Sequence, residues 1–320
     1  MNITVIGCGR WGTFLAYYLD LIGHKVTLYG RSSSQHYQEL RDTRTNGLVT
    51  LSPSLRLSDT LSSLDESDVV VISVGSQALR KLCNEEPLKE MKGKQVVLCM
   101  KGLEIGSGKR LSEVCAETLS PTNTVSVWLG PGHVQDFVKK VPNCMVIDSA
   151  SEKAKKVLID AFSGPLIRFY YGKDLIGNEI GAASKNVIGI AAGMLDGMGL
   201  SSLKGALMSR GTNEIARLID AMGGDSRSAY GLCHLGDYEA TVFSSHSHNR
   251  QYGESVVLGR PYTFLAEGYY TVKALMELRE RYRVELPICE AVYAVLYLNK
   301  DPRQTMDALF RRSLKTEFYQ

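Results

Sequence analysis

The sequence predicts an α/β protein whose N-terminal part is a doubly wound, mainly parallel sheet and whose C-terminal part is all-helical. Three observations predict this class. Short apolar runs alternate with spacers in the first half, a glycine-rich turn follows the first run, and the second half carries long segments with apolar residues at helical spacing. A length of 320 residues is sufficient for two domains of ordinary size.

The first half contains a series of continuous apolar runs, which are typical of strands covered on both faces. We expect strands at residues 2–7, 25–29, 68–74, 95–99, 124–128, 143–147 and 166–171, and a first helix at residues 13–22. Because these short runs alternate with helical or loop crossovers, most neighbouring strands are expected to be parallel.

The first strand runs directly into a turn with the G-x-G-x-x-G spacing of a Rossmann-like dinucleotide site. Its glycines are Gly7, Gly9 and Gly12. Residues without Cβ let the backbone approach a pyrophosphate, and the third glycine lets the helix pack on the strand so that its N-terminal amides face the phosphates. The turn predicts a nucleotide cofactor; an ordinary strand-to-helix turn is the alternative.

The end of the second strand bears on the choice of cofactor. An acidic residue there would bind the ribose hydroxyls of NAD, but the chain has Arg31 followed by serines and no carboxylate. A guanidinium binds a 2′-phosphate through paired charge-assisted hydrogen bonds, so the sequence favours NADP(H) over NAD(H). The alternatives are that Arg31 stacks on adenine or is a solvated loop residue.

The second half changes character near residue 174. Segments 176–193, 202–222 and 265–282 carry apolar residues at helical spacing. We place the boundary at residues 171–173, which gives a dinucleotide-binding domain at 1–172 and a helical substrate and catalytic domain at 173–320. Since ligands of open α/β sheets lie outside the carboxyl ends of the strands, the helical domain would close a cleft over that edge.

Composition argues against several classes of function. A net charge of +3 is too small for a nucleic-acid-binding surface. No apolar run is long enough to span a bilayer, and no apolar targeting segment precedes the first strand. The seven cysteines are scattered without a C-x-x-C pair, which is typical of reduced thiols in a cytoplasmic protein.

Two lysines stand out because their surroundings are apolar. Lys185 interrupts a small-residue helical segment, and Lys101 follows the apolar run that ends at Cys99. A buried ammonium must be paired or lower its pKa, and two lysines facing one cleft would lower a pKa toward the neutral range that a general acid requires. Asp237 could orient Lys185. An ordinary surface ion pair is the alternative for each residue.

A group of residues in the second half invites a metal hypothesis. His234, Asp237, His246 and His248 lie close in sequence, but their spacing fits no structural zinc pattern and no thiolate pair accompanies them. We therefore expect no metal site.

Short sequence blocks follow one another in a characteristic order along essentially the whole chain. They are G-x-G-x-W-G-T from Gly7, S-Q-A-L-R from Ser76, K-G-L-E from Lys101, K-N-V-I-G-I-A-A-G from Lys185, L-G-D from Leu235, N-R from Asn249, A-E-G from Ala266 and L-P-I-x-E-A-V-Y from Leu286. In this order they resemble the bacterial NAD(P)-dependent glycerol-3-phosphate dehydrogenase family. The resemblance implies hydride transfer between NAD(P)H and dihydroxyacetone phosphate to give sn-glycerol 3-phosphate, the precursor of phospholipids. The apolar helical half is compatible with a homodimer.

The resemblance also implies roles for individual residues. Lys185 would be the proton donor or acceptor at the substrate oxygen, and Lys101 would polarise the carbonyl. The residues expected to bind substrate are Lys101, Gly130, Gly132, Lys185, Asp237, Ser247, His248, Asn249 and Arg250. Those expected to contact the cofactor are Gly7, Gly9, Arg10, Trp11, Gly12, Arg31, Lys101, Val134, His248 and Glu267.

Three departures from the family pattern leave the substrate open. His248 stands where the family has an arginine that grips the substrate phosphate, and a histidine gives at most one charged hydrogen bond, only when protonated. Arg250 or Lys204 would then have to take over. The other departures are Gly132-His133 for a serine and a phenylalanine, and Gly75 for a proline. The alternative functions are a related NADP-dependent reductase of another small keto substrate and a non-catalytic nucleotide-binding sensor.

Overall fold

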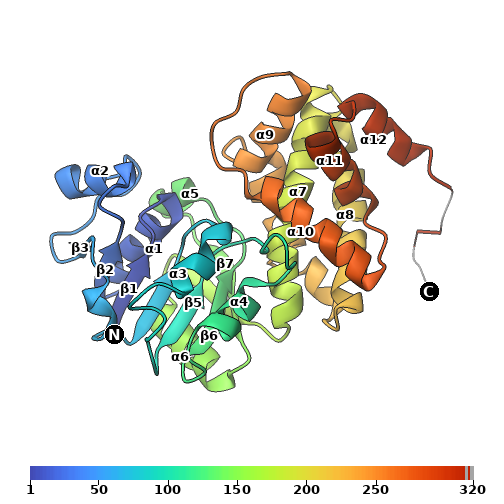
Figure 1. Ribbon diagram of the computed structural model, residues 1–320. Helices are drawn as coiled ribbons and strands as arrows, with labels where there is room; N and C mark the ends of the chain where they lie inside the picture. The colour runs from blue at the N-terminus through green and yellow to red at the C-terminus, as the bar shows by residue number, and fades with distance from the viewer. Residues whose placement is uncertain (314–315, 318–320) are drawn as a thin grey trace.

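The N-terminal half is built on one eight-stranded sheet. The structure is a computed structural model that describes residues 1–313 and 316–317 (Figure 1). The strands are β1 (Asn2–Ile6), β2 (Lys25–Tyr29), β3 (Arg56–Ser58), β4 (Val69–Ile72), β5 (Gln95–Leu98), β6 (Thr124–Leu129), β7 (Asn143–Ser149) and β8 (Ile167–Tyr171). Their order is β3-β2-β1-β4-β5-β6-β7-β8, and the pairings are parallel except between β6 and β7. The predicted mainly parallel sheet is confirmed, whereas the edge strand β3 is too short to leave an apolar run in the sequence.

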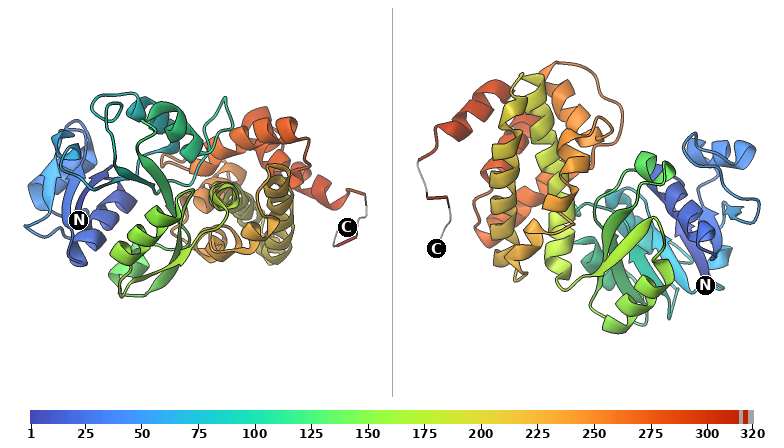
Figure 2. Two further views of the ribbon diagram at one scale, coloured as in Figure 1. Left: turned by 90° about the horizontal axis from the view of Figure 1, so that it is seen from below. Right: turned by 180° about the vertical axis from the view of Figure 1, so that it is seen from behind.

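The C-terminal half is helical, as predicted (Figures 1 and 2). The helices around the sheet are α1 (Arg10–Leu21), α2 (Gln35–Thr43), α3 (Leu79–Cys83), α4 (Leu111–Thr118), α5 (Val134–Val138) and α6 (Glu152–Phe162). Those of the helical half are α7 (Leu175–Gly197), α8 (Lys204–Ala221), α9 (His248–Val257), α10 (Glu267–Tyr282), α11 (Pro287–Leu298) and α12 (Pro302–Phe310). Residues 314–315 and 318–320 of the predicted helical domain lie outside the described residues. No described helix combines the length and apolar character needed to cross a membrane.

The winding of the sheet reverses at β1, which pairs with β2 on one side and β4 on the other. Ligands of such sheets bind outside the carboxyl ends of the strands at this reversal. The glycine turn follows β1, and residues 74–76 follow β4 at the same edge. The topology therefore puts the predicted cofactor turn at the crevice.

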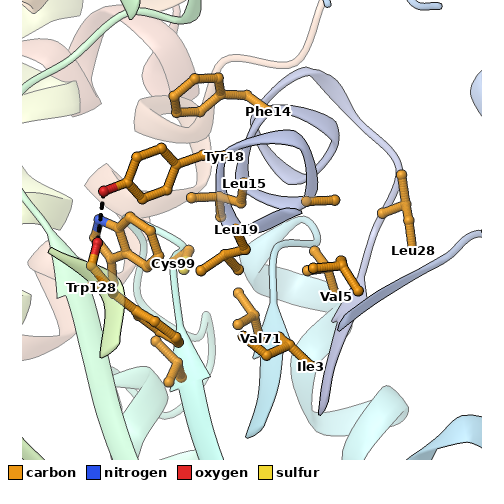
Figure 3. Packing of buried hydrophobic residues seen from close by; sticks show 14 of the residues in the cluster. Ile3, Val5, Phe14, Leu15, Tyr18, Leu19, Leu28, Val71, Cys99 and Trp128 are labelled. Atoms are coloured by element: carbon orange, nitrogen blue, oxygen red, sulfur yellow. Dashed lines mark hydrogen bonds between the residues drawn. The ribbon is translucent and has the colours of Figure 1, made fainter. Parts of the chain in front are cut away.

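Helix α1 is fixed on the sheet by a row of buried side chains (Figure 3). Phe14, Leu15 and Tyr18 are fully buried among residues of the central strands, and the Tyr18 hydroxyl donates to the carbonyl oxygen of Phe162 at 2.6 Å. Burial of each large side chain contributes about 1.5–3 kcal/mol. This packing holds the N-terminus of α1 in place at the crevice.

Helix α7 is buried along most of its length because its surface is made of small residues. A Cβ at Gly193 would collide with the backbone carbonyl of Arg250, and a Cβ at Gly253 would collide with that of Ile190. Glycine at these two positions lets α7 and α9 pack backbone to backbone. In both Figure 1 and Figure 2, the loop that follows α9 lies on the side of the helical half that faces the sheet half.

Candidate active site

Each of the three glycines in the turn is required for a different structural reason. Gly7 has φ +113°, and a Cβ there would collide with the carbonyl oxygen of Ser73. A Cβ at Gly12 would collide with the carbonyl oxygen of Gly7, so these two glycines are required by packing. A Cβ at Gly9 would meet no atom within 4 Å. Gly9 thus keeps the space in front of the α1 amides clear, which is what a pyrophosphate needs.

Two predicted cofactor residues lie beside this turn. Arg31 is exposed just beyond the end of β2. Trp11 is half-buried, with its ring centroid 5.3 Å from that of Phe14 and 6.2 Å from that of Phe137. Trp11 therefore lies beside the turn and is held in place by its packing on the aromatic core.

Lys101, Lys185 and Asp237 meet in one cluster, although they come from three separate segments. One carboxylate oxygen of Asp237 (Oδ2) lies 2.7 Å from Lys101 Nζ and 2.9 Å from Lys185 Nζ. Lys101 also donates to the carbonyl oxygen of Gly130 at 2.6 Å. Side-chain exposure is 20% for Lys101, 8% for Lys185 and 1% for Asp237. Lys101 is thus the most exposed of the three side chains, and the other two are buried.

The electrostatics of this cluster favour proton transfer. Burial lowers the pKa of Lys185 to about 8, and the charge of Lys101 adds to this effect, while Asp237 opposes it. The second oxygen of Asp237 (Oδ1) is buried without a hydrogen-bond partner in the described part of the chain. The cluster therefore holds an ammonium that can give up its proton near neutral pH, beside an acceptor with unused capacity.

Thr241 completes the cluster, although it was not predicted as a site residue from the sequence. Its hydroxyl accepts a hydrogen bond from Lys185 Nζ at 2.6 Å and donates to the Asp237 carbonyl oxygen at 2.8 Å. Thr241 lies in a π-helical turn, residues 239–243, and such turns are frequent at functional sites. The spacing of four residues from Asp237 was the signal available in the sequence.

A chain of amides ties the cluster to the neighbouring helices. Asn186 donates to the carbonyl oxygen of Lys101 at 2.8 Å, and Asn249 donates to Asn186 Oδ1 at 3.0 Å. Asn249 Oδ1 accepts from the backbone N–H of Gly268 at 2.9 Å. Asn249, predicted to orient substrate, thus bridges α7, α9 and α10. Asn186 was recognised in the sequence only as the neighbour of Lys185.

Glu267, at the start of α10, reaches across to the sheet half. Its carboxylate accepts from the backbone N–H of Ser76 at 3.2 Å and from the Ser76 hydroxyl. Burial raises the pKa of Glu267 despite these bonds. A Cβ at Gly102 would collide with the Ser76 side chain, so the segment after Lys101 is packed tightly here. Glu267 therefore helps to join the two halves beside the turn that follows β4.

The segment after β6 lies beside the catalytic cluster, because the Gly130 carbonyl oxygen accepts from Lys101 Nζ. Gly130 and Gly132 have φ values of +125° and +147°, which favour glycine at both positions. His133 Nε2 lies 2.7 Å from the carbonyl oxygen of Ala240, so this nitrogen carries the proton. Burial, and the positive charge of nearby Lys185, lower the pKa of His133 and keep its ring neutral. Val134 is buried at the start of α5.

His248 is the first residue of α9 and meets a residue of α1. Its Nε2 lies 2.8 Å from a terminal guanidinium nitrogen of Arg10, and its Nδ1 lies 2.7 Å from the hydroxyl of Tyr262. Burial, and then the charge of Arg10, lower the pKa of His248. The structure thus joins one predicted cofactor residue and one predicted substrate residue from opposite halves.

Arg250 and Lys204 are committed elsewhere. Arg250 NH1 lies 2.6 Å and Lys204 Nζ 2.7 Å from the same oxygen of Asp196. The hydroxyl of Ser247 accepts from the backbone N–H of Arg250 at 3.3 Å and caps α9. The predicted compensation for His248 by Arg250 or Lys204 therefore conflicts with this arrangement, because both cations already neutralise Asp196.

The histidines of the metal hypothesis are dispersed. His234 is fully buried between the carbonyl oxygen of Gly181 and the Tyr238 hydroxyl, and burial lowers its pKa to about 4. His246 is exposed. Within residues 1–313 and 316–317, no three His, Cys, Asp or Glu side chains lie close enough to hold a metal ion.

Comparison with known proteins gives matches over both halves. The family model for the N-terminus of NAD-dependent glycerol-3-phosphate dehydrogenase matches residues 2–155, and the model for its C-terminus matches residues 174–307. A glycerol-3-phosphate dehydrogenase (NAD(P)+) of Thermoanaerobacter sp. is 36% identical over 333 residues, covering 100% of this chain and 99% of the relative.

Two further relatives agree. A glycerol-3-phosphate dehydrogenase (NAD(P)+) of Prosthecochloris aestuarii is 38% identical over 332 residues, covering 99% of this chain and 100% of the relative. The crystal structure of glycerol-3-phosphate dehydrogenase from Coxiella burnetii superposes with a TM-score of 0.90 at 28% identity, covering 97% of this chain and 99% of that one.

Proposed function

The chain belongs to the NAD-dependent glycerol-3-phosphate dehydrogenase family, and on that premise we propose that Lys101, Lys185 and Asp237 are its catalytic residues. The enzyme transfers a hydride between NAD(P)H and dihydroxyacetone phosphate, giving sn-glycerol 3-phosphate. One observation carries the assignment: two lysines share a single oxygen of a buried aspartate, and one of them has its pKa lowered to about 8.

The residues of the cluster divide the work of ketone reduction. The reduced nicotinamide supplies the hydride. As the carbonyl carbon of the substrate is reduced, negative charge develops on its oxygen, and the ammonium of Lys101 stabilises that charge from the exposed side of the cluster. Lys185 donates the proton, since its lowered pKa makes the ammonium a competent acid. Asp237 holds both lysines in position, and Thr241 orients Lys185.

The glycine turn and its neighbours are proposed to bind the cofactor. The open space beside Gly9 would suit the pyrophosphate, and Trp11 and Glu267 would contact other parts of the cofactor. Arg31 is proposed to bind the 2′-phosphate of NADP(H), because an arginine and not an acidic residue follows the end of β2 in the chain.

The division of labour follows the two halves of the chain. We propose residues 1–172 as the dinucleotide-binding domain and residues 173–320 as the helical substrate and catalytic domain, with the sheet ending at Tyr171 and α7 beginning at Leu175. A cytoplasmic location is supported by the free thiols of the described structure. A homodimer is supported by exposed apolar side chains on the helical half, such as Leu298 and Phe310.

The test is oxidation of NADPH and of NADH by the purified protein with dihydroxyacetone phosphate, dihydroxyacetone and a panel of small 2-keto acids. We expect turnover with the phosphorylated ketone far above that with the others, and a higher kcat/KM for NADPH than for NADH. Preferred turnover of a 2-keto acid would support the alternative reductase. Cofactor binding without turnover of any ketone would support the non-catalytic sensor, and preference for NADH would overturn the role of Arg31.

A further inference from the structure

The phosphate of the substrate needs a positively charged partner, and most cations near the cleft are already held. The two lysines of the catalytic cluster share Asp237. Lys204 and Arg250 share Asp196, and each also donates to a backbone carbonyl. A substrate dianion would have to break these buried pairs, which is unfavourable because Asp196 would then be left without its counter-ions.

His248 acts as an acceptor in this arrangement. The hydroxyl of Tyr262 donates to Gln251 Oε1 at 3.1 Å, so it accepts from Nδ1–H of His248. The remaining ring nitrogen, Nε2, then has a free lone pair, which accepts from the guanidinium of Arg10 at 2.8 Å. His248 is therefore neutral and fixes the direction in which Arg10 points.

In contrast to these four paired cations, Arg10 has no acidic partner among the described residues. It is exposed, and among the described residues no carboxylate lies within ion-pair distance of it. A guanidinium has five N–H donors in a planar fork, and the contact with His248 uses one of them. The remaining donors can bind phosphate oxygens in pairs.

Arg10 also stands where an anion is stabilised from two directions. It is the first residue of α1, and His248 is the first residue of α9, so their side-chain contact links the N-terminal ends of two helices from opposite halves. Helix N-termini favour negative charge. This contact is linked to the catalytic cluster, because Asn249, the residue after His248, donates to Asn186 Oδ1, and Asn186 donates to the Lys101 carbonyl oxygen.

We propose that Arg10, positioned by His248 and Tyr262, binds the phosphate group of the substrate and sets the preference for phosphorylated ketones. This inference rests on the proposed function and moves Arg10 from the cofactor to the substrate. Arg10 belongs to the sheet half, whereas the catalytic lysine Lys185 belongs to the helical half. A bound substrate would therefore contact both halves of the chain.

The experiment compares wild type with R10S, R10S/H248R and the control R168S, a change of an exposed arginine on the edge strand β8. For each protein, kcat/KM is measured with dihydroxyacetone phosphate and with dihydroxyacetone, together with KM for the reduced cofactor. In R10S, the ratio of the two kcat/KM values should fall about 10- to 100-fold, since hydrogen bonds from a guanidinium to a phosphate are lost. The double variant supplies a guanidinium from α9 and should recover most of that ratio, whereas R168S should keep the wild-type ratio.

Other outcomes overturn the inference in distinct ways. A raised KM for the cofactor in R10S with an unchanged substrate ratio would assign Arg10 to the cofactor pyrophosphate. An unchanged ratio and an unchanged cofactor KM would leave Arg10 without a ligand role. Inorganic phosphate titrated by calorimetry gives an independent readout that needs no turnover, and R10S should bind it at least about 10-fold more weakly than wild type. Equal affinities would reject the inference. Failure of wild type to prefer the phosphorylated ketone would reject the proposed function alone.

Discussion

Two clusters in this molecule have nearly the same composition and very different character. In each, a single oxygen of an aspartate binds two cations: the buried Asp237 binds Lys101 and Lys185, and Asp196, whose side chain is 12% exposed, binds Lys204 and Arg250. The Asp196 cluster lies within the helical half. The Asp237 cluster joins the helical half to Lys101 of the sheet half.

The difference between the clusters is saturation. The second oxygen of Asp196 accepts from the Ser201 hydroxyl at 2.6 Å. Burial opposes ionisation of Asp196, but bonds from Lys204, Ser201 and Arg250 outweigh it and lower the pKa. In the other cluster, Asp237 Oδ1 is unpartnered among the described residues, and the pKa of Lys185 is lowered to about 8. A saturated cluster stabilises a fold, whereas an unsaturated one can exchange a proton with a substrate.

The largest effect should come from removing the ammonium at the unsaturated cluster. Lys185→Met keeps the length of the side chain but deletes the proton donor, so kcat for ketone reduction should fall by about 10²–10⁴-fold. The measurement is steady-state kinetics at saturating cofactor. Lys204→Met, at the saturated cluster, serves as the matched control and should stay within about threefold of wild type. Comparable losses in both variants would mean that the two clusters do not differ in function.

Stability should show the opposite order. Lys204→Met leaves the partly buried charge of Asp196 with Arg250 as its remaining cation, so the free energy of unfolding should fall by about 1–3 kcal/mol. Lys185→Met should cost less, because burial of the Lys185 ammonium is itself unfavourable, as its lowered pKa shows. Urea unfolding followed by far-UV circular dichroism measures both. A larger loss for Lys185→Met would contradict the assignment of the structural role to the Asp196 cluster.

The smallest expected effect is a shift in the pH dependence of the reaction rate, which should differ between variants of the two clusters. The acid form of Lys185 is required for ketone reduction, so the single-turnover rate should be constant well below pH 8 and fall as pH rises through about 8. Alcohol oxidation needs the free amine, so its rate should rise through the same midpoint. Asp237→Asn removes a charge that raises the pKa of Lys185, and the midpoint should move to lower pH. Lys204→Met should retain the wild-type midpoint, and a flat profile between pH 7 and 9 would exclude Lys185 as the acid.

Local signals explain what the sequence could predict. Gly7, Gly9 and Gly12 lie within six residues of chain, and Lys185 is conspicuous in a small-residue helix, so both features are visible without a structure. The contact between Arg10 and His248 joins residues 238 positions apart and depends on how the two halves pack. Helix α9 was not predicted, because its sequence shows no apolar residues at helical spacing: among the described residues, Gly253 is its only buried one.

Substitutions in the glycine turn affect either the amount of folded enzyme or its activity, depending on the position. Side chains at position 7 or 12 collide with backbone, so they reduce the quantity of folded protein. A methyl group at Gly9 meets no neighbour, and its backbone φ of −70° suits any residue, so it leaves a stable protein whose nucleotide pocket is obstructed. Substitutions within one turn therefore have two different consequences: those at Gly7 or Gly12 reduce the amount of folded protein, and those at Gly9 leave a folded protein that is inactive.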